Sequence, residues 1–324
     1  TAASIVEAIN RALSDSMAAD ETVVLIGEDI GVDGGVFRAT DGLLQAYGTG
    51  RVIDAPLAEA GIAGVAVGLA SQGMRPVAEI QFMGFIYSTL DQVINHASRL
   101  RNRTRGRLSC PMVLRAPYGG GIRAPEHHSE SMEAIFAHVP GIRVVIPSSP
   151  SKAYGLLRAA IADPDPVVFL EPKRIYRATS EDIPEGMDTP LDKCFVLRKG
   201  EDVALVTWGA MTVECMAAAD ALSNEGIEAM VVDVATLKPL DDETIFDAVG
   251  RTGRIVVVHE APYTGGFGAE IAARVAERNL FHLRAPIERV AGYDTVMPLA
   301  KLEDAYLPSV ERIADAVRRT MAYG

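Results

Sequence analysis

The acidic side chain best placed to do chemistry is Glu59, because it precedes a run that is otherwise wholly apolar. Residues 60–70 contain only glycine, alanine, valine, isoleucine and leucine. A carboxylate in the first turn of a helix is commonly just a charge that interacts favourably with the helix dipole. Since this helix is apolar on all sides, we expect it to be buried, and Glu59 with it. Buried carboxylates usually have a partner and a shifted pKa, so Glu59 is a candidate for holding a proton.

Two adjacent histidines are the second candidate for acid–base chemistry. His127 and His128 lie within Glu126–His127–His128–Ser129–Glu130, shortly after Gly119–Gly120–Gly121, which let a backbone approach another group closely. Neighbouring histidines point in divergent directions and no H-E-x-x-H spacing accompanies them, which disfavours a transition-metal site. Imidazoles beside such a loop suit proton transfer near neutral pH. The alternative is a polar loop without chemistry.

The common nucleotide and hydrolase motifs are missing from the chain. It contains neither G-x-x-x-x-G-K-[ST] nor G-x-S-x-G, which disfavours a Walker-type site and a hydrolase elbow. Gly265, Gly266 and Gly268 follow an expected strand and could suggest a dinucleotide loop. Ile271 occupies the place of the third glycine, so a tight turn between strand and helix is the favoured interpretation.

Short apolar runs alternate with helical patterns along the whole chain. Apolar strands separated by helices indicate an α/β fold, with parallel sheets covered on both faces. The expected strands are Val23–Gly27, Pro76–Ile80, Met112–Arg115, Val144–Pro147, Val167–Leu170, Val203–Thr207, Met230–Val234, Ile255–His259 and Ile287–Val290. The expected helices are an N-terminal one with a Ser4–Glu7 capping box, then Gly61–Gln72, Leu90–Arg105, Ser151–Ala162, Thr212–Glu225, Asp241–Gly250, Glu270–Arg278 and Ser309–Met321.

The length of 324 residues indicates two domains. Ser180–Lys193 is acidic, contains two prolines and lacks an apolar period, so we expect a linker there, between domains at 1–185 and 186–324. The formal net charge of −12 disfavours nucleic-acid binding, and no segment has the apolar length of a membrane helix. The three cysteines are widely spaced, which indicates reduced thiols. We expect a cytoplasmic protein, or a mitochondrial matrix protein if a transit peptide has been removed.

Several segments together resemble one family. They are Gly27–Glu28–Asp29–Ile30, Gly34–Gly35–Val36–Phe37, Asp54–Ala55–Pro56–Leu57–Ala58–Glu59, Ala78–Glu79–Ile80–Gln81–Phe82, Arg115–Ala116–Pro117–Tyr118–Gly119–Gly120–Gly121, His128–Ser129–Glu130–Ser131, Pro166–Val167–Val168–Phe169–Leu170–Glu171–Pro172–Lys173 and His259–Glu260–Ala261–Pro262. The chain resembles the β subunit of the thiamine-diphosphate-dependent decarboxylase component of 2-oxo acid dehydrogenase complexes. The pyruvate and branched-chain members are the most similar.

The resemblance implies a pyrimidine-binding α/β domain followed by a transketolase-like C-terminal domain. It also implies a heterotetramer of two α and two β subunits that passes acyl groups to a lipoyl acyltransferase core. In this family the α subunit holds the diphosphate and Mg²⁺ through a G-D-G motif. This chain has no G-D-G, which agrees with a β subunit and disfavours a stand-alone transketolase-like enzyme.

The resemblance also assigns roles to individual residues. Glu59 matches the glutamate that hydrogen-bonds the aminopyrimidine of thiamine diphosphate, and Leu57 and Gln81 match positions that line the same pocket. Phe85 matches an aromatic position that packs on the aminopyrimidine; otherwise it is an ordinary core residue. His128 matches the histidine that assists acyl transfer to the lipoyl arm, whereas the role of His127 stays open.

A structural monovalent-cation site, K⁺ in this family, is the last implied feature. Its positions fall on Met112, Val113, Ala160, Ile161, Asp163 and Asp165. Taken alone, Asp163–Pro164–Asp165–Pro166 indicates only a turn between a helix and a strand.

The substrate implied by the resemblance is a small 2-oxo acid. The early segments favour pyruvate, whereas Tyr263–Thr264–Gly265–Gly266–Phe267 and Gly292–Tyr293–Asp294–Thr295 look more like branched-chain enzymes. The alternatives are an acetoin dehydrogenase β subunit, a stand-alone transketolase-like enzyme and a catalytically silent scaffold for the acyltransferase core.

Overall fold

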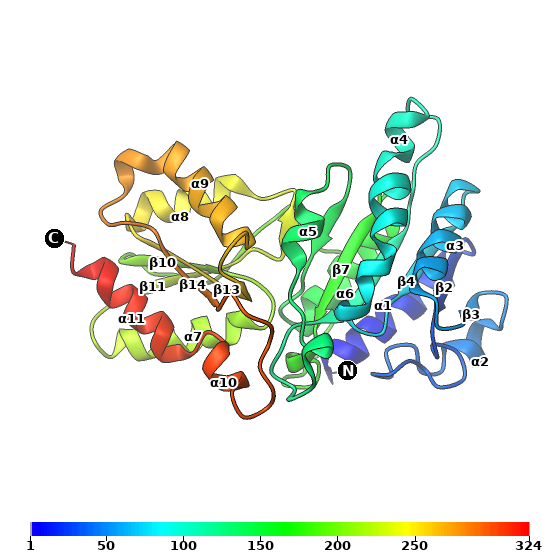
Figure 1. The fold of residues 1–324 in the computed structure, drawn as a ribbon, viewed down its shortest axis with the longest axis horizontal. Helices are drawn as coiled ribbons and strands as arrows, with labels where there is room; N and C mark the ends of the chain where they lie inside the picture. The colour runs from blue at the N-terminus through cyan, green and yellow to red at the C-terminus, as the bar shows by residue number, and fades with distance from the viewer. Residues whose placement is uncertain (1, 324) are drawn as a thin grey trace. The chain divides into compact units, whose positions relative to one another are not determined.

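The computed structural model describes residues 2–323 and divides into two compact units (Figure 1). The first unit holds residues 1–118 and 135–191, and the second holds residues 119–134 and 192–324. The division after Leu191 falls inside the acidic segment expected to be a linker, and the domain boundary after residue 185 stays a prediction. The segment Gly119–Ala134, which carries both histidines, belongs to the second unit although it interrupts the first in sequence.

Six parallel strands run side by side in the first unit, in the order β6–β7–β5–β4–β2–β3. The bounds are β2 Val23–Gly27, β3 Val52–Asp54, β4 Arg75–Glu79, β5 Val113–Tyr118, β6 Arg143–Val145 and β7 Val167–Pro172. All residues of β2, β5 and β7 are buried. The short strands β1 (Ala2–Ala3) and β8 (Glu181–Asp182) pair antiparallel apart from this sheet.

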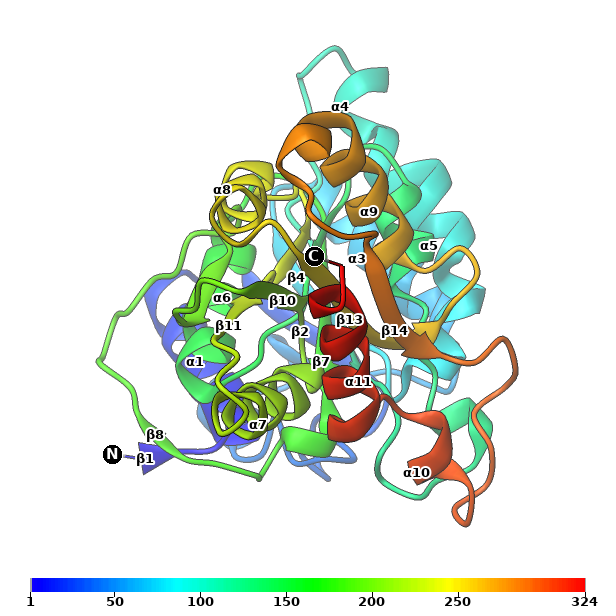
Figure 2. The ribbon, with the colours of Figure 1, turned by 90° about the vertical axis from the view of Figure 1, so that its left-hand side faces the viewer.

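Helices cover the first sheet on both sides. Helix α1 (Ile5–Ala19) begins with the expected capping box, and it packs against α6 (Pro150–Ala162) on one side of the strands, with α3 (Glu59–Ser71) on the other (Figure 2). The remaining helices of this region are α2 (Leu43–Tyr47), α5 (Glu133–His138) and the short 3₁₀ turn η5 (Lys173–Ile175).

The prediction of a single helix over Leu90–Arg105 is wrong. The chain forms a 3₁₀ segment η1 (Met83–Thr89), a π-helical segment η2 (Asp91–His96), a 3₁₀ turn η3 (Ala97–Arg99) and a short α4 (Leu100–Arg103). The Thr89, Ser98 and Thr104 hydroxyls donate to the carbonyls of Ile86, Ile94 and Leu100. Such side-chain bonds to nearby carbonyls compete with a regular helical ladder, which a pattern of apolar residues does not reveal.

The second unit contains a five-stranded sheet in the order β14–β13–β10–β11–β9. Its strands are β9 Phe195–Arg198, β10 Val203–Thr207, β11 Ala229–Asp233, β13 Ile255–Pro262 and β14 Glu288–Gly292; only β9 is antiparallel to its neighbour. Helices α7 (Met211–Ser223) and α11 (Val310–Met321) cover one face, and α8 (Asp242–Thr252) and α9 (Phe267–Asn279) cover the other (Figure 1). Shorter elements are β12 (Thr236–Lys238), η6 (Leu280–His282) and α10 (Glu303–Tyr306).

These two sheets confirm the expected α/β class, because their central strands are buried on both faces. The three cysteines are free and buried, as expected of reduced, packed thiols, and burial raises the pKa of Cys110 to about 12. Among the residues described, no helix combines the length and apolar character that crossing a membrane requires.

Candidate active site

Three neighbouring strands of the first unit end at the same level. Gly27, the last residue of β2, lies opposite Asp54 at the end of β3 and Glu79 at the end of β4. The chain leaves β2 toward β3, whereas from β4 it continues to the other half of the sheet. Ligands of parallel α/β sheets bind at such a point, outside the carboxyl ends of the strands. The residues that follow the strands, among them Glu28, Glu59 and Gln81, therefore meet at one edge.

Polar contacts fix the loops at this edge. The Gly31 N–H donates to Oδ1 of Asp54 at 2.6 Å, and a Cβ atom on Gly31 would lie only 2.5 Å from Oδ2 of the same carboxylate. The Gln81 amide donates to Oδ2 of Asp29 at 3.2 Å and so joins the segments after β4 and β2. Gln81 thus has a defined place at the edge.

Glu59 is the first residue of α3 and is only half-buried. The helix buries one face, consisting of Ile62, Ala63, Ala66 and Ala70, and leaves Val65 50% exposed. The expectation that the whole helix is enclosed is therefore wrong for this chain by itself. The apolar residues outside the buried face form a surface, and Leu57 just before the helix is 74% exposed.

Glu28 is a titratable neighbour of Glu59 for which the sequence analysis predicted no role. Burial raises the pKa of Glu28, and the charges of Asp29 and Glu59 raise it further. Two carboxylates that repel one another favour a state in which one of them keeps its proton. The sequence signal that could have indicated Glu28 is its position directly after Gly27, the residue that ends β2 and lies opposite the end of β3.

Phe85 lies in η1, after β4, and belongs to a group of aromatic rings. Its ring centroid is 6.1 Å from that of Phe82 at 89°, and Phe82 in turn packs edge-on against Phe37 at 5.4 Å. Phe85 is half-buried. It therefore offers part of its ring to a ligand while its neighbours hold it in place.

A buried charge network lies at the ends of β4, β5 and β7. Arg115 donates through Nε and Nη2 to the two carboxylate oxygens of Glu171, at 2.6 and 2.8 Å, and also contacts Glu79. The hydroxyl of Tyr176 donates to Glu171. Burial raises the pKa of Glu79 against the opposing influence of Arg115. The network stiffens the end of the sheet from which Gln81 and Phe85 emerge.

His128 lies in the second unit, in the short 3₁₀ turn η4 (Glu126–His128). Its backbone N–H donates to the Pro125 carbonyl at 2.9 Å, and its side chain is half-buried whereas that of His127 is exposed. A pocket of about 480 Å³ adjoins the turn. Its lining residues are Ser129, Glu130, Ser131, Met132, Glu260, Pro262, Thr264, Asp294, Thr295, Val296, Met297 and Tyr306.

The glycines after β13 form the expected tight turn. Gly265 has a φ of +69°, and Cβ atoms on Gly266 and Gly268 would lie 2.6 and 2.8 Å from the His259 ring. These two glycines therefore let α9 pack closely on the strand.

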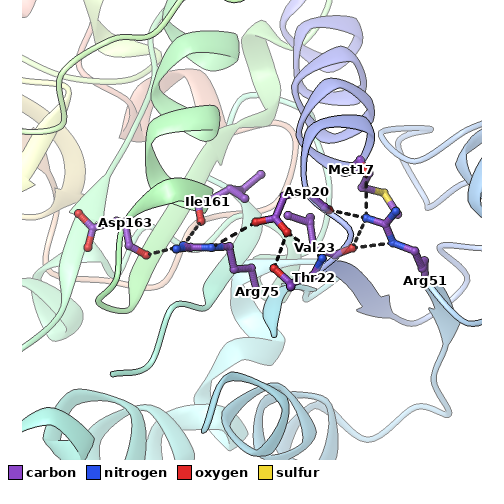
Figure 3. A network of polar contacts seen from close by, with 8 residues as sticks. All are labelled: Met17, Asp20, Thr22, Val23, Arg51, Arg75, Ile161 and Asp163. Carbon is purple, nitrogen blue, oxygen red and sulfur yellow. Dashed lines mark hydrogen bonds and ion pairs between the residues drawn. The ribbon is translucent and has the colours of Figure 1, made fainter. Parts of the chain in front are cut away.

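Two of the residues expected to hold a monovalent cation, Ile161 and Asp163, lie at the carboxyl end of α6 (Figure 3). The carbonyls of Ile161 and Asp163 both accept from Nη1 of Arg75, at 2.8 and 3.2 Å, and Arg75 also pairs with Asp20 at 3.5 Å. Backbone carbonyl oxygens are suitable ligands for such a cation, but two of them already accept hydrogen bonds from Arg75.

The other expected cation ligands have protein partners as well. The carbonyls of Met112 and Ala160 accept from the N–H groups of Val167 and Asp163. The carboxylates of Asp163 and Asp165 pair with Arg143 and Arg101. Val113 lies in β5, hydrogen-bonded between β4 and β7. Within residues 2–323, no three His, Cys, Asp or Glu side chains come together as a metal site.

Comparisons with known proteins agree with this architecture. Residues 1–179 match the family "Transketolase, pyrimidine binding domain", and residues 192–313 match "Transketolase, C-terminal domain". The chain is 48% identical over 316 residues to the pyruvate dehydrogenase E1 component subunit beta of Acholeplasma laidlawii, covering 97% of each chain. It is 47% identical over 318 residues to the 3-methyl-2-oxobutanoate dehydrogenase subunit beta of Mycobacterium tuberculosis, covering 98% of this chain and 91% of that one.

Solved structures share the fold at lower sequence identity. A split-gene transketolase described as an inactive beta4 tetramer matches with a TM-score of 0.82 and 24% identity, over 100% of this chain and 99% of that one. A transketolase mutant from Pichia stipitis matches with a TM-score of 0.73 and 14% identity, over 100% of this chain and 46% of that one.

Proposed function

The chain belongs to the family of E1 component β subunits of pyruvate and branched-chain 2-oxo acid dehydrogenases, and on this premise we propose that it supplies the pyrimidine-binding half of a thiamine diphosphate site. The observation that carries the proposal is the edge formed by Glu28, Glu59 and Gln81 at the ends of three adjacent parallel strands. This edge lies within the segment that matches the pyrimidine-binding family.

Glu59 is the acid–base group of the proposed site. Its carboxyl group would hydrogen-bond the ring nitrogen of the aminopyrimidine and exchange a proton with it. Leu57 and Gln81 would line the pocket, and Phe85 would pack on the pyrimidine ring. When bound, thiamine diphosphate supplies an electron sink for the loss of carbon dioxide from a 2-oxo acid.

An α subunit completes the proposed site, in an assembly of two α and two β chains. The exposed apolar face of α3 begins at Glu59, so a partner that covers this face also shields the carboxyl group from water. We assign the diphosphate and Mg²⁺ to the α subunit. In the β chain, K⁺ is proposed as a structural ion that shares the Ile161 and Asp163 carbonyls with Arg75.

The second unit takes part in acyl transfer. We assign His128 the role of assisting transfer of the acyl group to a lipoyl arm of the acyltransferase core. Pyruvate is the proposed substrate and branched-chain 2-oxo acids are the second candidate, favoured by the late segments that Thr264 and Asp294 join through bonds of 2.8 and 2.6 Å. An acetoin dehydrogenase β subunit is the remaining alternative.

The decisive experiment is co-expression of this chain with the α subunit encoded beside it. Reduction of an artificial electron acceptor is measured with thiamine diphosphate and Mg²⁺, on pyruvate, 3-methyl-2-oxobutanoate and 4-methyl-2-oxopentanoate, which lose carbon dioxide. Acetoin, whose C–C bond is cleaved without loss of carbon dioxide, is the fourth substrate. We expect activity only in the mixture, fastest with pyruvate. Activity of this chain alone would overturn the shared-site proposal, and a preference for another substrate would replace pyruvate.

A further inference from the structure

The segment Gly119–Ala134, which carries His128, is held to the rest of the second unit by buried carboxylates. The segment closes on itself through a bond from the Gly119 N–H to the Glu130 carbonyl at 2.8 Å. Between these ends the chain has little regular structure apart from the turn η4. Its position therefore depends on what anchors it.

Glu260 anchors the beginning of the segment. Its side chain, near the end of β13, is buried, and its Oε2 accepts from the Gly120 N–H at 3.2 Å. Gly119 has a φ of +87°, and a Cβ atom on it would lie 2.3 Å from Oε1 of Glu260. The carboxylate thus occupies the place where any other residue at position 119 would carry its side chain, so this close approach requires glycine.

Glu303 anchors the middle of the segment. It begins α10 and is 1% exposed, and both of its carboxylate oxygens accept from the Arg123 N–H at 3.2 Å. Arg123 has a φ of +59°, a left-handed conformation that a residue with a side chain adopts at a cost. The bond to Glu303 stabilises this conformation five residues before His128.

Burying two carboxylates is unfavourable unless they accept strong hydrogen bonds. Hydrogen bonds from N–H groups to a carboxylate are stronger than those between neutral groups. Both glutamates accept such bonds from the segment that carries His128. A third contact, from the indole N–H of Trp208 to Oε1 of Glu133 at 3.0 Å, fixes the far end of the segment.

We propose that Glu260 and Glu303 are positioning residues that set the place of His128 for acyl transfer. This inference rests on the proposed role of His128. Neither glutamate needs to touch substrate or cofactor, because each acts through the backbone of the segment. A displacement of about 1 Å of a catalytic group can cost up to about 100-fold in rate.

The test uses the complete α–β enzyme with three single substitutions. Glu260→Gln and Glu303→Gln change the acceptors, and Gly119→Ala changes the segment that they hold. Two rates are measured on each variant: reductive acylation of a lipoyl domain, and decarboxylation with an artificial acceptor. Amide hydrogen exchange of residues 119–132 reports the anchoring independently of activity. We expect faster exchange there and a ratio of acylation to decarboxylation that falls about ten-fold.

Asp241→Asn is the matched control. Asp241 is also a buried acid of the second unit that accepts backbone N–H groups, those of Cys194 and Thr244, but it does not contact the segment. It should alter stability without changing the ratio. Unchanged exchange in the Glu260 and Glu303 variants, or equal loss of both rates, would overturn the inference. His128→Ala tests the role of His128 separately from the anchoring by Glu260 and Glu303. If His128→Ala lowers both rates equally, the role assigned to His128 is wrong, even if hydrogen exchange shows that the two glutamates anchor the segment.

Discussion

Arg115 and Glu171 form a fully buried ion pair in which two parallel hydrogen bonds, of 2.6 and 2.8 Å, join strands β5 and β7. Glu79 on β4 contacts the same guanidinium, so one positive charge serves two carboxylates. The opposing charges of Glu171 and Glu79 outweigh burial and raise the pKa of Arg115. These contacts tie β4, the strand that Gln81 follows, to its neighbours β5 and β7.

Replacing this arginine should be costly for folding. Arg115→Leu would leave Glu79 and Glu171 buried without a counter-charge, and we expect a loss of about 3–5 kcal/mol of unfolding free energy. Urea unfolding measures the loss. The control is Arg318→Met, because Arg318 forms its ion pairs on the surface, where the contribution to stability is small. Equal effects of the two substitutions would contradict the structural role given to Arg115.

The role of Glu59 predicts a loss of chemistry without a loss of assembly. Glu59→Gln retains the size of the side chain but cannot give and take the proton, so decarboxylation with an artificial acceptor should fall by at least about 100-fold. The α–β assembly, measured by sedimentation, should be unchanged. Retained activity in this variant would show that the proton relay does not depend on Glu59.

The role of His128 predicts a selective loss. His128→Ala should lower reductive acylation of a lipoyl domain by about 100-fold, the lower end of what acid–base catalysis contributes, and decarboxylation with an artificial acceptor much less. His127→Ala is the matched control, because its side chain is the exposed neighbour on the same turn. Equal losses in both assays would refute the assignment.

Much of the fold was predictable from the sequence, because runs of β-branched residues indicate buried strands and apolar residues at helical spacing indicate the buried faces of helices. Strands β2 and β10 begin and end where the apolar runs do, and the Ser4–Glu7 capping box marks α1. Prediction from the sequence failed where side chains bond to the backbone, as in the segments η1 to α4, and it missed the short strands β3 and β9.

The candidate site was less predictable than the fold. The apolar composition of α3 predicted that its own chain encloses it. Composition cannot distinguish burial within the chain from burial against a partner subunit. Glu28 was overlooked because its pKa is raised first by burial and then by the charges of Asp29 and of Glu59, which lies 31 residues further along the chain. The contacts of Glu260 and Glu303 with the segment Gly119–Ala134 join residues more than a hundred positions apart, beyond any local pattern.

The exposed face of α3 predicts where the α subunit binds. Val65→Lys should weaken α–β association at least about ten-fold, because a charge would have to be buried in an apolar contact. The stability of the isolated chain should hardly change, since Val65 is already 50% exposed. Val213→Lys is the control, as Val213 is 49% exposed on α7 of the second unit. Association is measured by titrating the α subunit, and unchanged affinity of the Val65 variant would exclude this face.

Buried His259 predicts how stability depends on pH. The ring is stacked on Trp208 at 5.3 Å, and burial lowers its pKa from 6.5 to about 4. The unfolded chain therefore binds the proton more readily between those values, so the free energy of unfolding should fall as the pH drops from about 6.5 to about 4. The contribution is at most about 3 kcal/mol. His259→Phe should remove this part of the pH dependence in urea unfolding, whereas His282→Gln, at an exposed imidazole, should not. An unaltered pH dependence in the His259 variant would mean that burial does not lower the pKa of this ring in the folded chain.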